Sequence, residues 1–205
     1  MKKLLLTSDG LSSRKIKKAF LKLLEKPVAE TKVLIIHTLL KKSYIRYVRE
    51  VKKELQKLGI PRKNIFYANI SNNIKPSKFV SKNFDVLYSC GGNTFYILDR
   101  IRKTGFDKFI KNYIKKAKLY IGVSAGSIIV HKTIEIAGWG SEADSNDIHL
   151  NNLAGLTVTN IAVYPHYHAS LKKEIIDFKK TAGYPIKEIK DGQAVLILGN
   201  RVRKI

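Results

Sequence analysis

The chain has 205 residues, 44% of them hydrophobic, which suits a single globular domain over residues 1–205. No apolar run approaches the roughly 18 residues that a membrane span needs, so we expect a soluble, cytoplasmic protein. The single cysteine, Cys90, excludes an internal disulfide and a metal site built from several cysteines. We expect neither a metal nor a cofactor.

The formal net charge is +23, from 39 Lys and Arg against 16 Asp and Glu. The basic residues recur along nearly every predicted helix, mostly opposite the apolar stripe, so solvated helix faces account for most of the charge. A field of this sign attracts anionic ligands and binds nucleic acid non-specifically. The chain has no long basic run, aromatic-interleaved strand or helix-turn-helix pattern, so we expect no dedicated nucleic-acid binding.

Short apolar runs alternate with amphipathic segments in the first part of the chain. The runs predict strands over residues 3–7, 32–36, 64–68, 85–89 and 119–121. Apolar positions at helical spacing predict helices over residues 16–24, 43–58, 95–101 and 106–117. Ser12 or Ser13 can cap the first of these helices. This alternation predicts an α/β fold with a mostly parallel sheet, right-handed crossovers and flanking helices.

The last third of the chain is less regular. Its small and acidic residues predict a loop over residues 138–147 that forms a rim over the site. Strands are expected over residues 156–158 and 160–164, followed by a helix that carries residues 171–178. Two further strands, 194–198 and 201–205, are joined through Gly199 and Asn200 and predict an antiparallel hairpin at one edge of the sheet.

The pattern Gly-x-Ser-x-Gly spans residues 122–126, between an apolar run that predicts a strand and another that predicts a helix. Strand, sharp turn and helix are the setting of a nucleophile elbow. In such a turn the serine backbone is strained and the hydroxyl stands at a helix N-terminus, where backbone N–H groups can hold a developing oxyanion. Ser124 is therefore the candidate nucleophile.

A second glycine-containing turn follows the predicted fourth strand, at Gly91 and Gly92. Paired glycines between strand and helix let the backbone approach a ligand and point N–H groups at it. A tight turn with Asn93 or Thr94 as a helix cap explains the same residues equally well. A phosphate-binding loop is disfavoured, because neither G-x-G-x-x-G nor a lysine-terminated P-loop is present.

A serine hydroxyl needs a base within hydrogen-bond reach, and the base usually needs an orienting acid. His166 and His168 follow a predicted strand at a proline-containing loop, and we expect at least one of them in the site. The other histidines lie at a strand end, on the predicted elbow helix about two turns past the serine, and in a polar loop: His37, His131 and His149.

The residues alone do not identify the acid that orients the histidine. Asp144 or Asp147 would give the chain order Ser, Asp, His, whereas Asp191 would give Ser, His, Asp. Chain order does not decide between them, because triads recur in several orders. Each aspartate has the alternative role of capping a turn.

Three stretches together, residues 90–95, 120–127 and 164–166, resemble the aspartyl dipeptidase (dipeptidase E) family of serine peptidases. Their order and spacing cover roughly residues 85 to 198. Members of this family are similar in fold to class I glutamine amidotransferase domains, with a serine where those carry a cysteine. The resemblance therefore implies a flavodoxin-like α/β sheet.

The resemblance also implies roles for individual residues. Ser124 would be the nucleophile and His166 the base. The family's acid lies in a Glu-Gly pair after the last helix, and Asp191 with Gly192 matches its place. The resemblance further implies an oxyanion hole of backbone N–H groups at Gly91, Gly92 and Ala125. Further candidates to line the site are Asn93, Thr94, His168 and Asp144.

We therefore expect a metal-independent serine peptidase that acts on short peptides. The resemblance implies that the first residue of the substrate is an aspartate. The positive charge agrees with a small acidic peptide, and cyanophycin-degrading relatives share the Ser-Ala-Gly elbow. Two alternatives remain: an esterase-like serine hydrolase, and a non-catalytic binding module of the same fold that holds nucleic acid or an acidic partner. The sequence gives no indication of oligomeric state.

Overall fold

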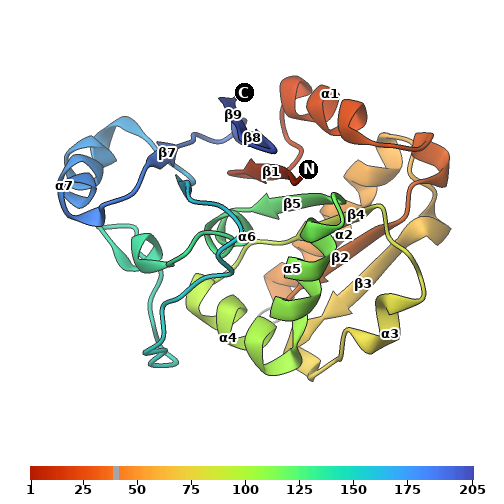
Figure 1. The fold of residues 1–205 in the computed structure, drawn as a ribbon, viewed down its shortest axis with the longest axis horizontal. Helices are drawn as coiled ribbons and strands as arrows, with labels where there is room; N and C mark the ends of the chain where they lie inside the picture. The colour runs from red at the N-terminus through yellow and green to blue at the C-terminus, as the bar shows by residue number, and fades with distance from the viewer. Residues whose placement is uncertain (39–41) are drawn as a thin grey trace.

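A seven-stranded sheet forms the centre of the computed structural model, which describes residues 1–38 and 42–205 (Figure 1). The strand order is β3-β2-β4-β5-β1-β8-β9. The neighbours among the first five strands pair in parallel, and β8 and β9 are antiparallel. The strands are β1 (Lys3–Thr7), β2 (Val33–His37), β3 (Ile65–Asn69), β4 (Val86–Ser89), β5 (Leu119–Val123), β8 (Ala194–Leu198) and β9 (Arg201–Lys204). The predicted α/β class, with a mostly parallel sheet and a C-terminal antiparallel hairpin, is confirmed.

Helices cover both faces of this sheet. They are α1 (Arg14–Leu23), α2 (Lys42–Lys57), α3 (Ser77–Val80), α4 (Thr94–Thr104), α5 (Phe106–Lys115), α6 (Ala125–Ile128) and α7 (Lys172–Ala182). Ser13 caps α1, because its side chain accepts a hydrogen bond from the backbone N–H of Ile16. Asn93 caps α4 in the same way.

The strands β1, β2, β4, β5 and β8 are apolar almost throughout because each face of the sheet packs against its own helix layer, whereas all four residues of the edge strand β9 are exposed. Successive side chains of a strand point to opposite faces. In β1, Leu5 belongs to the core that includes Phe20 of α1, whereas Leu4 and Leu6 belong to the core that includes Phe106 of α5. All five side chains are fully buried. The result is a helix, sheet, helix sandwich.

The register brings three strand ends together at one edge of the fold. Thr7, the last residue of β1, pairs with Val123 of β5, and Ser89 of β4 pairs with Gly122 of β5. The loops that follow these neighbouring parallel strands therefore begin side by side. In open α/β sheets this is where ligands bind.

The elbow helix is shorter than the sequence predicted. α6 ends at Ile128, so His131 lies outside it. The backbone carbonyls of Ile129 and Val130 accept hydrogen bonds from the N–H groups of Leu156 and Val158, at 2.7 and 2.8 Å. Because these partners come from a distant segment, the chain leaves the helix after a single turn.

The same contacts explain a second wrong prediction. Residues 156–158 do not form a strand, since their N–H groups donate to the carbonyls of residues 129–131 and not to a neighbouring strand. The approach is close: a Cβ at Gly155 would lie 2.2 Å from the carbonyl oxygen of His131. Glycine is therefore required there.

The predicted strand at 160–164 exists, but it lies outside the main sheet. β6 (Ala162–Tyr164) pairs in parallel with β7 (Ile186–Glu188) in a separate two-stranded sheet. Figure 1 shows β7 and α7 at the opposite end of the molecule from β2 and β3. The sequence did not predict β7, which has three residues and only one buried side chain.

Many of the basic side chains lie on outward faces, as expected. Lys18 and Lys22 of α1, and Lys115 of α5, are exposed. Within the described ranges, no helix combines the length and hydropathy that a membrane crossing would need.

Candidate active site

Ser124 stands at the turn between β5 and α6 in a strained backbone conformation. Its φ is 50° and its ψ is −115°, a positive φ that L-residues rarely adopt. The Ser124 N–H donates to the carbonyl of Thr7 at 3.0 Å, which fixes the turn against the end of β1. This is the geometry that the nucleophile-elbow pattern predicts.

The two flanking glycines are required by close backbone packing. A Cβ at Gly126 would lie 2.4 Å from the carbonyl oxygen of Ser89 in β4. A Cβ at Gly122 would lie 2.4 Å from the carbonyl oxygen of Gly126. The start of α6 can therefore pack closely against β4 and β5 only because both positions lack a side chain.

We expect Gly126→Ala to lower the free energy of unfolding by about 3 kcal/mol, the upper end of the usual cost of overpacking, because the overlap is with backbone that cannot rotate away. Urea unfolding measures this loss. The matched control is Gly105→Ala, where a Cβ meets no atom within 4 Å and only the positive φ opposes alanine. That change should cost about 1–2 kcal/mol. Equal losses in both variants would contradict the packing argument.

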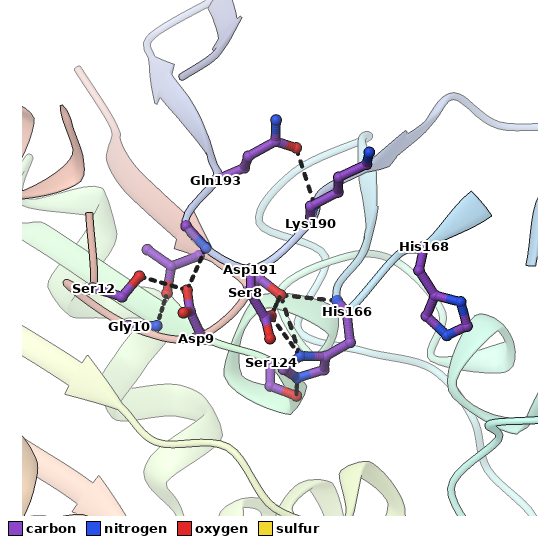
Figure 2. Close-up of polar contacts among 12 residues, drawn as sticks. Ser8, Asp9, Gly10, Ser12, Ser124, His166, His168, Lys190, Asp191 and Gln193 are labelled. Atoms are coloured by element: carbon purple, nitrogen blue, oxygen red, sulfur yellow. Dashed lines mark hydrogen bonds and ion pairs between the residues drawn. The ribbon is translucent and has the colours of Figure 1, made fainter. Parts of the chain in front are cut away.

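His166 follows β6, a strand of the small second sheet, after Pro165, and its side chain lies beside Ser124 (Figure 2). Its Nε2 lies 2.9 Å from Ser124 Oγ, and its Nδ1 lies 2.8 Å from Asp191 Oδ1. With the proton on Nδ1, the ring donates to the carboxylate and Nε2 accepts from the serine hydroxyl. The backbone of His166 has a φ of 55°, a second strained position at this site.

Asp191 lies in the turn that precedes β8. Burial raises the pKa of its carboxyl group, but hydrogen bonds from Ser8 and His166 outweigh this, so the pKa is held below its ordinary value. The side chain is nevertheless 61% exposed, and that of His166 is 47% exposed. The pair is therefore open to solvent on one side.

The other two candidate acids accept hydrogen bonds from other groups. Asp144 Oδ2 accepts hydrogen bonds from the N–H and the hydroxyl of Thr94, at 2.9 and 2.6 Å. The structure thus pairs His166 with Asp191 and uses Asp144 to hold the start of α4. Asp147 accepts a hydrogen bond from the Ser145 hydroxyl.

The remaining lining candidates hold the loop that borders the site. His168 points away from Ser124 (Figure 2), and its Nε2 lies 2.8 Å from Glu142. The Asn93 side chain donates to the carbonyl of Ser145 at 2.7 Å. These contacts, with that of Asp144, tie the 138–147 loop to α4 and to the segment after β6.

The glycine turn lies beside the elbow. A Cβ at Gly91 would lie 3.1 Å from Ser124 Cβ, and both Gly91 and Gly92 line the hollow next to the serine. Ala125 begins α6 directly after the serine. Within the part of the chain that the structure describes, the N–H groups of Gly92 and Ala125 make no hydrogen bond to another protein group.

Two hollows meet at Ser124 and His166. One, of about 430 Å³, is also lined by Ser8, Asp9, Tyr47, Gly91, Gly92 and Val123. The other, of about 180 Å³, is bordered by the predicted rim loop and lined in addition by Ile128, Ile136, Ala137, Trp139, Glu142, Asp144, Tyr164 and Pro165. Among the described lining residues there is no lysine or arginine, although the chain carries a net charge of +23.

Sequence reasoning missed several of these residues. Ser8 and Asp9 follow the first predicted strand and were not among the predicted site residues, yet both line the larger hollow. The available signal was their place after a parallel strand that neighbours the elbow strand. Tyr47 and Trp139 gave no sequence signal, because their place in the site depends on how α2 and the rim loop pack.

Neither hollow is lined by His37, His131 or Cys90. His37 is buried, its ring forms a T-shaped pair with that of Tyr67, and burial lowers its pKa. His131 packs on Tyr184, with ring centroids 4.4 Å apart. Cys90 is buried, and burial raises the pKa of its thiol well above the ordinary value. Across the described residues, no three His, Cys, Asp or Glu side chains gather as a metal-binding group.

Comparison with known proteins identifies the family of this chain. The model of peptidase family S51 matches residues 4–205. The Listeria monocytogenes protein Lmo0363, named an uncharacterized peptidase, is 33% identical over 162 residues, which are 76% of this chain and 76% of that one. Peptidase E of Nostoc sp. PCC 7120 is 26% identical over 125 residues, 61% of this chain and 47% of that protein.

A solved structure extends the likeness to the whole chain. The crystal structure of a candidate peptidase E from Listeria monocytogenes EGD-e superposes with a TM-score of 0.78 at 30% identity, covering 100% of this chain and 98% of that one. Fold and relatives define a hydrolase of the peptidase class. The chain belongs to peptidase family S51.

Proposed function

We propose that this peptidase is of the serine type and cleaves short peptides through an acyl-enzyme, with Ser124, His166 and Asp191 as its triad. One observation carries the proposal. His166 lies within hydrogen-bond distance of both Ser124 Oγ, at 2.9 Å, and Asp191 Oδ1, at 2.8 Å. Nucleophile, base and orienting acid in this relation are recognised by their geometry and not by their order along the chain.

In the first half of the reaction, His166 Nε2 takes the hydroxyl proton as Ser124 Oγ attacks the scissile carbonyl carbon. Asp191 accepts the Nδ1–H hydrogen bond and stabilises the imidazolium that forms. His166 then donates the proton to the leaving amine as the peptide bond breaks. The acyl group remains as an ester on Ser124.

In the second half, a water molecule gives a proton to His166 and attacks the ester. Collapse of the tetrahedral intermediate releases the carboxylic acid, and the proton returns to Ser124 Oγ. The N–H groups of Gly92 and Ala125 hold the oxyanion in both halves, with Gly91 giving the loop its close approach. In other enzymes each such donor contributes roughly 3–4 kcal/mol to transition-state stabilisation.

The alternatives are less well supported. An esterase would use the same triad, but the family and its named relatives are peptidases. A non-catalytic module would not need the hydrogen bond between Ser124 and His166, and strained backbone such as that of Ser124 clusters at active sites. A binding site for nucleic acid at this position lacks basic residues among the described lining.

The nature of the first substrate residue is a separate matter. The family resemblance implies an N-terminal aspartate, and the net positive charge agrees with an acidic peptide. The charge of the lining residues argues against an acidic first residue, because Asp9, Glu142 and Asp144 line the two hollows. Two unit charges about 4 Å apart interact by about 1 kcal/mol even in water. We therefore propose short peptides whose first residue is neutral or basic.

A dipeptide panel tests both parts of this proposal. With Ala-Leu, Lys-Leu and Asp-Leu as substrates, we expect release of leucine in each active case, with kcat/KM for Lys-Leu at least about fivefold above that for Asp-Leu. A matched ester of alanine measures the esterase alternative. A preference for Asp-Leu would reject the charge argument and keep the peptidase. No turnover of any dipeptide, with rapid ester hydrolysis, would favour the esterase.

A further inference from the structure

The turn that carries Asp191 is held by the loop after β1. The Ser8 N–H donates to the carbonyl of Gln193 at 3.2 Å, and the Gly192 N–H donates to Asp9 Oδ1 at 2.9 Å. A third contact joins the Ser8 hydroxyl to Asp191 Oδ1 at 2.6 Å (Figure 2). These contacts follow from the sheet, because β1 and β8 are antiparallel neighbours with Thr7 opposite Ala194.

The Ser8 hydroxyl also contacts His166. It accepts a hydrogen bond from the backbone N–H of His166 at 2.8 Å, and it lies 3.3 Å from Nδ1 of the ring. A hydroxyl has one proton to donate. Because the backbone N–H must be the donor in its contact, that proton goes to Asp191. One oxygen atom therefore joins the acid and the backbone of the base.

Burial makes this contact more than an incidental surface bond. Ser8 is fully buried, whereas the Asp191 side chain is 61% exposed. A solvent-exposed ion pair by itself fixes geometry weakly. The Asp191 carboxylate is thus held from its inner side by a buried hydroxyl group, and the same oxygen accepts a hydrogen bond from the strained His166 backbone.

We propose that Ser8 is a positioning residue of the hydrolytic site, which sets the Asp191 carboxylate and the His166 backbone in the relation that lets His166 accept the Ser124 proton. This inference rests on the proposed function. Ser8 touches no reacting atom and acts through Asp191 and His166. An aspartate is one methylene shorter than the glutamate that the family resemblance implies at this place, and a fixed inner anchor holds the shorter side chain in reach of the ring.

The test compares Ser8→Ala with Ser12→Ala. Ser12 lies on the same loop and donates to Asp9 at 2.7 Å, but it does not contact Asp191 or His166. For Ser8→Ala we expect kcat for the best dipeptide to fall by about 10-fold to 100-fold, with KM changed less than about threefold, as for the loss of one charge-assisted hydrogen bond. Ser12→Ala should stay close to the parent protein.

A second readout does not depend on turnover. Carboxyl carbon NMR follows the titration of Asp191, whose pKa should rise in Ser8→Ala, because a donor to the ionised form is lost, and should not move in Ser12→Ala. Ser8→Cys keeps the size of the side chain with a weaker donor and should give an intermediate rise, which covers the case that the alanine variant folds poorly.

An unchanged Asp191 titration and an unchanged kcat in Ser8→Ala would overturn the inference while leaving the proposed peptidase intact. If no peptide is hydrolysed by the parent protein, the proposed function fails, and the titration alone decides whether Ser8 sets the state of Asp191.

Discussion

Ser124→Ala is expected to lower kcat for dipeptide hydrolysis by at least about 10⁴-fold, the largest effect of any single change in this chain. The variant keeps the Gly92 and Ala125 N–H donors and both hollows, so a residual rate above that of water should remain. Because the Ser124 hydroxyl hydrogen-bonds to His166 alone among the residues that the structure describes, folding should be unaffected. Steady-state kinetics and thermal unfolding measure the two properties.

The control is Ser81→Ala, which removes an exposed hydroxyl between α3 and the start of β4, at the other end of the sheet. Its kcat should equal that of the parent protein. If Ser124→Ala keeps full activity on the panel, the acyl-enzyme mechanism is wrong, whatever the family.

Asp191→Asn has the second-largest expected effect. An asparagine keeps the size of the side chain, but its uncharged amide no longer stabilises the imidazolium and can hold the wrong histidine tautomer, which costs about 10⁴-fold in kcat in serine proteases with this triad. Steady-state kinetics at neutral pH measures the loss. We expect KM to change little, since the interaction strengthens mainly in the transition state.

Two matched changes make this prediction specific. Asp144→Asn should lower kcat less than about tenfold, because Asp144 holds Thr94 and does not contact His166. Asp177→Asn removes an exposed carboxylate of α7 that pairs with Lys180, and it should have no effect. A larger loss at Asp144 than at Asp191 would reassign the acid to the rim loop.

The inner strands of the central sheet could be predicted from the sequence because they are continuous apolar runs, each bounded by turn residues. β1 and β5 show this most clearly, and their neighbours follow the same rule. The elbow was also predictable, because a strand, a Gly-x-Ser-x-Gly turn and an apolar run occur in sequence there. These signals come from residues that are close together in the sequence, and no contact with a distant segment changes the structure that they predict.

The segments that the sequence misplaced depend on distant partners. The end of α6 and the absence of a strand at 156–158 both result from hydrogen bonds between residues 129–131 and 156–158, which no periodicity reports. β7 is too short and too exposed to stand out. Ser8 is 183 residues from Asp191 in the chain, and only the pairing of β1 with β8 brings them together.

The acid of the triad likewise depends on contacts between segments that are far apart in the sequence. From the residues alone, Asp144, Asp147 and Asp191 were all open, and the family resemblance favoured Asp191. The structure separates them through two contacts, Asp144 with Thr94 and Asp191 with His166. Neither contact could be derived from spacing, because each joins loops that follow different strands.

Fluorophosphonate labelling tests the central claim most directly, since the reagent forms a covalent bond only with an activated serine. After digestion, mass spectrometry of the labelled protein should find the adduct on Ser124, with labelling strongly slowed in His166→Ala and absent in Ser124→Ala. An unlabelled parent protein, or an adduct on any other serine, would contradict the account of Ser124 as a nucleophile activated by His166.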